Sequence, residues 1–436
     1  MLEPVRSTTV GATARPPLPA QTERLDECAY RTELDGGTVI LSERMASVRS
    51  IALGFWFRQG RIHEASDVQG VSHLLEHMVF KGTARRSALE IAAEIERVGG
   101  VLDAYTTHEA TTFLARVPLE HLDLALDVLC DLAFEPVLRD EDLDLEREVV
   151  LEEIAAAEET PEDVAFELHA NFLYAGHPYG EPILGTRDSV GSMSRASLIS
   201  VHRASYRPSN LVIAAAGAVD HADLIARVRD RLPASGPIGP RPEEPAVVGA
   251  TGYRRVDRPD GRQTHVVAGS LAVPYRDPLR PAVVVACTAL GAGMSSRLFQ
   301  RIREDLGLAY NVHSFHCFFA EAGHVGAYFG ARPENAVAAR EVLAEELSTF
   351  ARDGLRPKEL EDTRTQLKGQ ILISLESPSA RMNRLAGVAL FEQPYRTLDE
   401  VAARIDAVTT EECAAAAALF DPARAAMLEL SPVEPS

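Results

Sequence analysis

His73-Leu74-Leu75-Glu76-His77 is the stretch around which the rest of this 436-residue chain is organised. It lies in a segment with apolar residues at helical spacing, which are Val71, Leu74, Leu75 and Met78. On a helix, residues four apart lie on the same face, so the imidazoles of His73 and His77 point toward one position. Two imidazoles in this arrangement suit zinc, and the neighbouring Glu76 is placed to take a proton from a water molecule.

The motif has the order H-x-x-E-H, which inverts the sequence of the common zinc peptidase helix. An exposed helix with two histidines and no metal could have the same sequence. A zinc site therefore needs the support of a third ligand. Glu146 and Glu153 are seven residues apart in the predicted helix 141–159 and share one of its faces. One glutamate of this helix could bind the metal while another holds a histidine by a hydrogen bond. The spacing does not choose between them.

The composition is that of an ordinary globular protein with an acidic surface. Hydrophobic residues make up 46% of the chain, charged residues make up 25%, and the net charge is -20. This charge and the lack of a basic stripe argue against nucleic acid as a partner. The sequence contains no run of 18 apolar residues, so we expect no transmembrane helix and no membrane partner.

The residue usage also bears on the cellular compartment. The five cysteines are scattered and never in C-x-x-C spacing, which favours a reducing compartment. Lysine is rare beside arginine, a bias associated with GC-rich bacterial genes. The predicted location is therefore the bacterial cytoplasm.

The predicted strands and helices occur in the same order in two parts of the chain. The first part has strands within 30–59 and at 101–106, 111–117 and 211–216, and helices at 71–82, 87–99, 119–134, 141–159, 194–206 and 221–232. The second part has strands at 264–273, 310–319, 323–330 and 425–430, and helices at 282–290, 295–306, 334–352 and 358–376. This repeat predicts an α+β fold of two homologous halves, each a mixed or antiparallel β-sheet packed with helices.

The distribution of proline and apolar residues divides the chain into four segments. Residues 1–24 are predicted to be a loose N-terminal tail, because they lack the apolar core of a secretory signal. Residues 25–232 form the N-terminal zinc-binding half. Residues 233–260 form a Pro-rich linker, since prolines cluster at its start. Residues 261–436 form the C-terminal substrate-positioning half, which has no H-x-x-E-H motif.

Two segments give the chain a specific resemblance to a known family. Residues 73–83 read HLLEHMVFKGT, and residues 146–153 read EREVVLEE. In these segments the chain resembles the M16 family of zinc peptidases, and its size and layout resemble the processing-peptidase-like branch. The resemblance covers about residues 30–430. It implies that His73, His77 and Glu153 bind one zinc ion per chain, that Glu146 supports the site, and that Glu76 is the general base.

The same resemblance assigns substrate contacts in the second half and at one strand. Arg303 and Tyr310 match an Arg and Tyr seven apart that hold the substrate backbone in this family, and both side chains suit a developing negative charge. Strand 101–106 reads Asp103-Ala104 where the family usually has Asn-Ala. Its main chain is suited to take up a peptide as an added strand. The role of the Asp103 side chain stays open.

A further pair of acidic residues follows the predicted zinc glutamate. Asp163 and Glu167 are four apart, so on a helix they present two carboxylates on one face. By resemblance, processing peptidases use acidic residues at these positions to hold an arginine of the substrate. A solvated acidic helix face is the alternative.

Taken with the resemblance, the sequence predicts a zinc-dependent endopeptidase that cleaves extended, unfolded peptides in a cavity between the two halves. The resemblance implies a dimer as the working unit, and because one chain carries both the metal motif and the Arg303–Tyr310 pair, we expect a homodimer. The alternative is a non-catalytic scaffold, or the partner subunit of a heterodimeric processing peptidase. Such subunits usually lack a histidine or the glutamate of the motif, and this chain lacks none of them.

Overall fold

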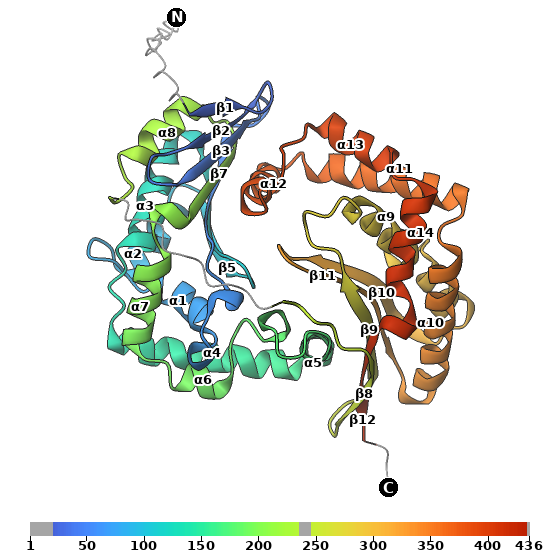
Figure 1. Cartoon of the computed structure of the whole chain (residues 1–436). Helices are drawn as coiled ribbons and strands as arrows, with labels where there is room; N and C mark the ends of the chain where they lie inside the picture. The colour runs from blue at the N-terminus through green and yellow to red at the C-terminus, as the bar shows by residue number, and fades with distance from the viewer. Residues whose placement is uncertain (1–20, 235–245, 434–436) are drawn as a thin grey trace, which may run out of the picture.

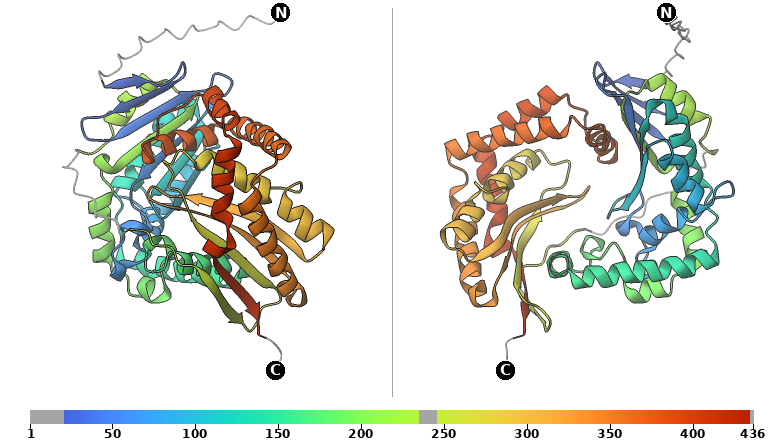
Figure 2. Two further views of the ribbon diagram at one scale, coloured as in Figure 1. Left: turned by 45° about the vertical axis from the view of Figure 1, so that its right-hand side comes forward. Right: turned by 180° about the vertical axis from the view of Figure 1, so that it is seen from behind.

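The structure is a computed structural model that describes residues 21–234 and 246–433. Two halves face each other, and each half is built on one β-sheet with helices on its outer side (Figures 1 and 2). Most of the predicted tail and the first part of the predicted linker lie outside the described residues. Within the described residues, no helix has the length and apolar character needed to cross a membrane.

The N-terminal half contains a seven-stranded sheet in the order β1-β2-β3-β7-β4-β6-β5. The strands are β1 (Thr22–Arg24), β2 (Ala29–Glu33), β3 (Val39–Arg44), β4 (Ser50–Phe57), β5 (Val101–Thr106), β6 (Thr111–Pro118) and β7 (Leu211–Gly217). The helices are α1 (Val71–Val79), α2 (Ala88–Glu96), α3 (Leu122–Phe134), α4 (Asp140–Glu159), α5 (Pro161–Leu173), α6 (Arg187–Gly191), α7 (Arg195–Ser205) and α8 (His221–Arg229). The central strand β4 is buried almost throughout. Its alternate side chains enter two separate hydrophobic clusters, one on each face of the sheet.

The C-terminal half contains a five-stranded sheet in the order β10-β11-β9-β12-β8. The strands are β8 (Gly252–Arg258), β9 (Thr264–Ala272), β10 (Ala309–Phe318), β11 (Gly323–Ala331) and β12 (Ala426–Pro432). The helices are α9 (Arg280–Gly291), α10 (Pro333–Asp353), α11 (Pro357–Ser374), α12 (Pro378–Leu390), α13 (Leu398–Asp406) and α14 (Thr410–Ala417), with a π-helix at Phe299–Asp305.

The two sheets share one topology. The order β3-β7-β4-β6-β5 corresponds strand for strand to β8-β12-β9-β11-β10. In both sheets the first pair is parallel, and the remaining three pairs are antiparallel. The predicted α+β fold of two matching halves is therefore confirmed.

The halves are joined by an exchange of helices. Helix α12 of the C-terminal half packs on β3, β4 and β7 of the N-terminal sheet. Helix α5 of the N-terminal half packs on β9 and β12 of the C-terminal sheet. In Figures 1 and 2 both helices lie between the two halves. Each sheet thus has its inner face covered by a helix that belongs, in the sequence, to the other half.

Three predicted boundaries differ from the structure. Residues 252–258 were assigned to the linker, but they form β8, an exposed and charged edge strand that lacks the apolar alternation of a core strand. Residues 22–24 were assigned to the tail, but they form β1, which pairs with β2. The helix predicted at 295–306 is shorter than expected and runs as a π-helix from Phe299.

The exchange predicts that one buried side chain of α12 stabilises the packing between the halves. Leu385 is fully buried against the N-terminal sheet, so Leu385→Ala should lower the free energy of unfolding by about 2–5 kcal/mol. The only tryptophan, Trp56, lies buried in the same cluster, so its emission during urea unfolding reports on this contact.

Asn383→Ala on the exposed side of the same helix is the matched control, with an expected change within about 0.5 kcal/mol. Equal urea midpoints for Leu385→Ala and the control would show that α12 does not hold the halves together.

Candidate metal centre

Helix α1 is held at its start by two local features. Gly70 has φ 85°, a left-handed conformation that favours glycine, and a Cβ there would lie 2.6 Å from the carbonyl oxygen of Leu184. The carboxylate of Glu64 accepts the backbone N–H groups of Gly70 and Ser72, both at 2.8 Å. These bonds satisfy donors that the first turn of a helix leaves free.

The apolar face of α1 is fully buried in the core of the N-terminal half, and consists of Val71, Leu74, Leu75, Met78 and Val79. His73 and His77 lie on the remaining, half-buried face. Figure 1 shows α1 beside α4, which it contacts. The two histidines therefore face the helix that carries the acidic residues.

Three side chains meet between these helices. His73, His77 and Glu153 each offer one ligand atom, and these atoms lie within 4.8 Å of one another. The Nε2 atoms of His73 and His77 lie 3.5 and 3.6 Å from the carboxylate oxygens of Glu153. Tetrahedral zinc with bonds of about 2.0–2.2 Å needs ligand atoms roughly 3.3–3.6 Å apart, so two imidazoles and a carboxylate in this arrangement fit the ion.

Glu146 orients one of these histidines. Its buried carboxylate lies 3.1 Å from Nδ1 of His77, and its other oxygen pairs with the ammonium group of Lys81. A proton on Nδ1 that is donated to Glu146 leaves Nε2 with its lone pair, which is the form that binds metal. Burial, and next the charge of His77, lowers the pKa of His73 to about 4, so this imidazole is neutral at physiological pH.

Glu76 is buried between α1 and strand β5. It accepts a hydrogen bond of 2.6 Å from the hydroxyl of Thr106, the last residue of β5. Burial raises the pKa of Glu76 above its usual value, while the bond from Thr106 acts in the opposite direction. A carboxyl group with a raised pKa beside a metal site is suited to accept a proton and later return it.

Strand β5, which contains Asp103 and Ala104, is the edge strand nearest this carboxylate. Within residues 21–234 and 246–433 it pairs with β6 alone, so its second edge carries free backbone groups. The exposed Asp103 turns its carboxylate to the backbone N–H of Ala104, at 2.9 Å. This bond engages the Asp103 side chain and the backbone N–H of Ala104 with each other.

Arg303 and Tyr310 contact each other in the C-terminal half. The π-helix carries Arg303, whose Nη1 donates to the carbonyl oxygen of Tyr310 at 3.0 Å and whose guanidinium lies 4.5 Å over the Tyr310 ring. The pairing of β10 with β11 shifts between Ala309 and Asn311, so Tyr310 sits at a bulge and is 76% exposed. None of the described contacts joins either residue to the three converging side chains.

Asp163 and Glu167 lie on α5 and are both exposed. Desolvation, and next the charge of Glu158, raises the pKa of Glu167. The neighbouring Glu162 accepts hydrogen bonds from Asn311 at 3.3 Å and Tyr328 at 3.2 Å, both in the C-terminal half. The start of α5 is therefore close to the residue that follows Tyr310.

Sequence reasoning missed three side chains that shape this centre: Glu64 at the start of α1, Lys81 beside Glu146, and Thr106 beside Glu76. Lys81 lies within the motif segment 73–83, and Thr106 is the last residue of β5. Their roles depend on the packing of α1 against α4 and β5, which spacing within one segment does not reveal.

Comparison with family models matches both halves of the chain. Residues 39–187 match the model described as insulinase (peptidase family M16). Residues 192–367 match the model described as the peptidase M16 inactive domain. The first range contains the converging side chains and Glu76, and the second contains Arg303 and Tyr310.

Curated relatives match over most of their length. An uncharacterized zinc protease of Streptomyces coelicolor is 38% identical over 395 residues, covering 89% of this chain and 86% of the relative. One of Mycobacterium tuberculosis is 38% identical over 393 residues, covering 89% of each. The Bacillus subtilis zinc protease YmxG is 34% identical over 391 residues, covering 87% of this chain and 93% of the relative.

Two solved structures share the fold. A peptidase M16 inactive domain from Pseudomonas fluorescens superposes with a TM-score of 0.86 at 20% identity, covering 93% of this chain and 98% of that one. A protease from Helicobacter pylori superposes with a TM-score of 0.87 at 19% identity, covering 92% and 99%.

Proposed function

The chain belongs to the M16 peptidase family, and on this basis we propose that it is a zinc-dependent endopeptidase that cleaves extended, unfolded peptides. The observation that carries the proposal is the convergence of His73, His77 and Glu153 next to the buried Glu76. Two imidazoles and one carboxylate hold a single zinc ion and leave a position open, which is the donor set of catalytic sites. The bacterial relatives carry the name zinc protease.

In the proposed reaction, different residues of the chain transfer protons and hold the zinc ligands in place. When bound, zinc polarises the scissile carbonyl and makes a nearby water more acidic. Glu76 takes the proton of the attacking water and returns it to the leaving amine, and Thr106 holds Glu76 in place for both transfers. Glu146 keeps His77 in the tautomer that binds metal, with its own charge balanced by Lys81.

The free edge of β5 supports a substrate in extended form. A peptide added to this edge at Ala104 lies next to Thr106 and therefore next to Glu76. Arg303 and the exposed hydroxyl of Tyr310 supply donors for the peptide from the other half. A Tyr310→Phe variant with unaltered turnover would remove this hydroxyl from the proposal.

The proposal includes the bacterial cytoplasm as the location and a homodimer as the assembly. The dimer rests on the likeness to processing peptidases, and it is a homodimer because one chain holds both sets of residues. Light scattering on the purified chain would give twice the mass of one chain for a homodimer. The mass of a single chain would refute it.

Replacement of a zinc ligand tests the metal. The three convergent side chains predict one zinc per chain in the natural protein, and His77→Ala should bring the zinc content below one while the fold is retained. Metal analysis measures the zinc content. His121→Ala is the matched control, because His121 lies in the 3-10 turn Leu119–His121 and is not one of the three converging side chains. Full zinc occupancy in His77→Ala would contradict the assignment.

Replacement of Glu76 tests the general base. Glu76→Gln keeps the shape of the side chain but cannot accept a proton, so kcat should fall by about a hundredfold or more with zinc retained. A peptide-library digest read by mass spectrometry, with and without a chelator, first identifies cleaved peptides for this assay. Glu148→Gln, an exposed glutamate on α4, is the control. A loss of only a few-fold in Glu76→Gln would exclude it as the base.

The acidic pair on α5 tests the preference for basic substrates. We propose that Asp163 and Glu167 hold an arginine of the substrate, since a planar guanidinium makes several charge-assisted bonds to paired carboxylates. The double variant Asp163→Asn, Glu167→Gln should cleave arginine-containing peptides less well and neutral peptides equally. Matched peptides with arginine or norleucine at each subsite measure this, and an unchanged kcat/KM ratio at every subsite would remove the pair from the site.

A further inference from the structure

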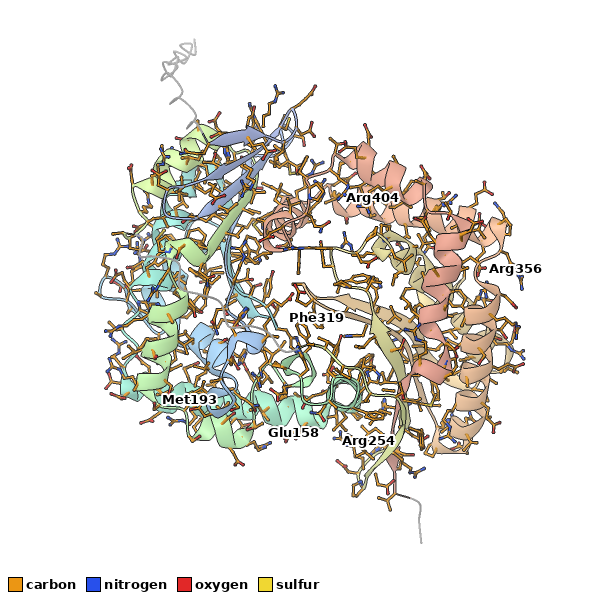
Figure 3. All side chains as sticks on the ribbon, viewed as in Figure 1. Glu158, Met193, Arg254, Phe319, Arg356 and Arg404 are labelled. Atoms are coloured by element: carbon orange, nitrogen blue, oxygen red, sulfur yellow. The ribbon has the colours of Figure 1, made fainter. Side chains whose placement is uncertain are left out.

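A pocket of about 360 Å³ lies between α12 and other helices of the C-terminal half. Its walls come from α9, α11, α12, α13 and the segment 393–396. Arg404, which lines it, lies at the upper right of the molecule in Figure 3, whereas α1 and α4 lie at the lower left of the same view in Figure 1. The pocket is therefore separate from the candidate metal centre.

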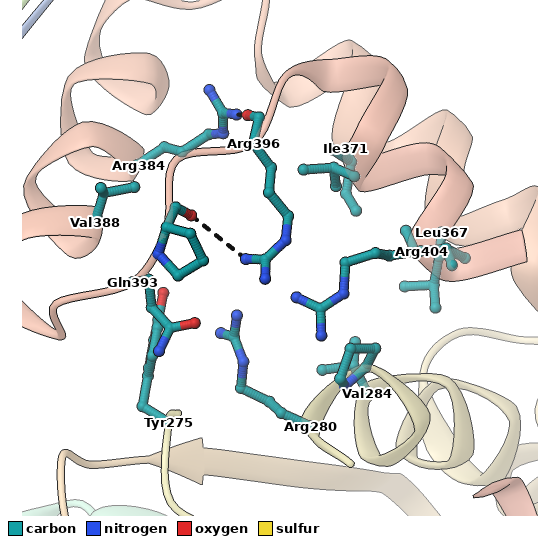
Figure 4. Close-up of a pocket in the computed structure, with 14 residues that line it drawn as sticks. Tyr275, Arg280, Val284, Leu367, Ile371, Arg384, Val388, Gln393, Arg396 and Arg404 are labelled. Carbon is teal, nitrogen blue, oxygen red and sulfur yellow. Dashed lines mark hydrogen bonds between the residues drawn. The ribbon is translucent and has the colours of Figure 1, made fainter. Parts of the chain in front are cut away.

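Three arginines from three separate segments point into this pocket and toward one another (Figure 4). Arg280 is the first residue of α9, Arg396 precedes α13, and Arg404 lies on α13. In the part of the chain that the structure describes, the side chains of Arg280 and Arg404 make no hydrogen bond or ion pair. Arg396 donates only to the carbonyl oxygen of Pro394, at 3.4 Å.

The direction of Arg280 is set by an aromatic neighbour that carries no charge. The guanidinium of Arg280 lies 3.9 Å over the ring of Tyr275, which in turn stacks on Phe391. A fourth arginine, Arg384, differs because it pairs with Glu43 at 3.4 Å and donates to the carbonyl oxygen of Arg396. Among the described residues that line the pocket, none carries a carboxylate.

A cluster of like charges is costly, and no residue of the pocket lining offsets it; Glu412, outside the lining, acts on Arg404 in the opposite sense. The cluster occurs in a chain of net charge -20. Burial, and next the positive charges of Arg396 and Arg280, lowers the pKa of Arg404. An anion in the pocket would relieve this repulsion and accept bonds from several guanidinium N–H groups at once. The acidic surface elsewhere repels anions, so any uptake depends on this local cluster.

The remaining wall of the pocket is apolar and includes Val284, Ile371, Val388 and Ile405. A free inorganic ion would leave this wall in contact with water. A ligand with an apolar part covers it and gains from the burial. The volume is that of a site for a small molecule.

We propose that this pocket binds a small organic anion, a carboxylate or phosphate attached to an apolar group. Arg280, Arg396 and Arg404 bind the anionic group, and the apolar side chains of α9, α11, α12 and α13 contact the rest. A ligand in the pocket would contact α12, the helix that packs on the N-terminal sheet. Binding does not depend on the proposed peptidase function, since no residue of the metal centre lines the pocket.

Titration calorimetry on the full chain tests the chemistry of the ligand with hexanoate, hexyl phosphate and hexanol. We expect the two anions to bind and hexanol to give no binding. Affinity should rise by about fourfold for each methylene from butanoate to hexanoate. The anion that binds more tightly shows whether the anionic group of the natural ligand is a carboxylate or a phosphate. Absence of binding for both anions, or equal binding of hexanol, overturns the proposal.

Arg404→Gln tests the cluster itself. It should weaken binding of the tighter anion by at least about tenfold, because a charge-assisted hydrogen bond is lost. It should also raise the melting temperature of the ligand-free chain, because one of three repelling charges is removed. If Arg404 instead stabilised the fold, Arg404→Gln would lower the melting temperature of the ligand-free chain.

Arg276→Gln is the matched control, because Arg276 lies near the pocket without lining it and pairs with Glu392 on the surface. This variant should bind the anion as the natural chain does. Unchanged affinity in Arg404→Gln, or an equal loss in Arg276→Gln, would refute the site.

Discussion

The packing of both faces of each sheet is the constraint on which this molecule depends. The alternate side chains of β4 fill two clusters, so a sheet covered only on its outer side would leave a second apolar face in water. Residues of α12 such as Met382 and Leu385 complete the inner cluster of the N-terminal sheet. Residues of α5 such as Ala165 do the same for the C-terminal sheet. The arrangement of the halves thus follows from the need of each sheet for a helix from the other.

The packing between the halves also positions the candidate metal centre, because only Thr160 separates helix α4 from helix α5. Helix α4, which carries Glu146 and Glu153, ends at Glu159, and α5 begins at Pro161. Because α5 is anchored on β9 and β12, the end of α4 is held by the opposite half. At its other side, α4 packs on α1, whose start is fixed by Gly70 and Glu64. Side chains that lie on two helices in one half are therefore positioned by packing that involves both halves.

Features that depend on spacing within one segment can be predicted from the sequence. The helix of the motif, the face shared by Glu146 and Glu153, and the duplicated order of elements all have local periodicity, and each corresponds to an element of the structure. The partners of α5 and α12 could not be predicted, because the apolar face of a 13-residue helix does not specify which sheet it packs against. Strand β8 could not be predicted because its charged residues resemble a linker, and the meeting of Arg280 with Arg396 and Arg404 could not because Arg280 is far from the other two in the chain.

The helix exchange also determines the order in which the protein becomes complete during synthesis. Strand β7 ends at Gly217, whereas α12 begins at Pro378, so the ribosome makes the intervening chain while the inner face of the first sheet is uncovered. At about 5–20 residues per second this interval lasts roughly 10–30 s. The apolar face of α5 stays uncovered for longer, since one of its partner strands, β12, ends at Pro432. The inner face of the first sheet is therefore uncovered until α12 has been made, and the apolar face of α5 is uncovered until β12 has been made. A nascent chain of this protein thus exposes apolar surface that the completed fold buries between the halves.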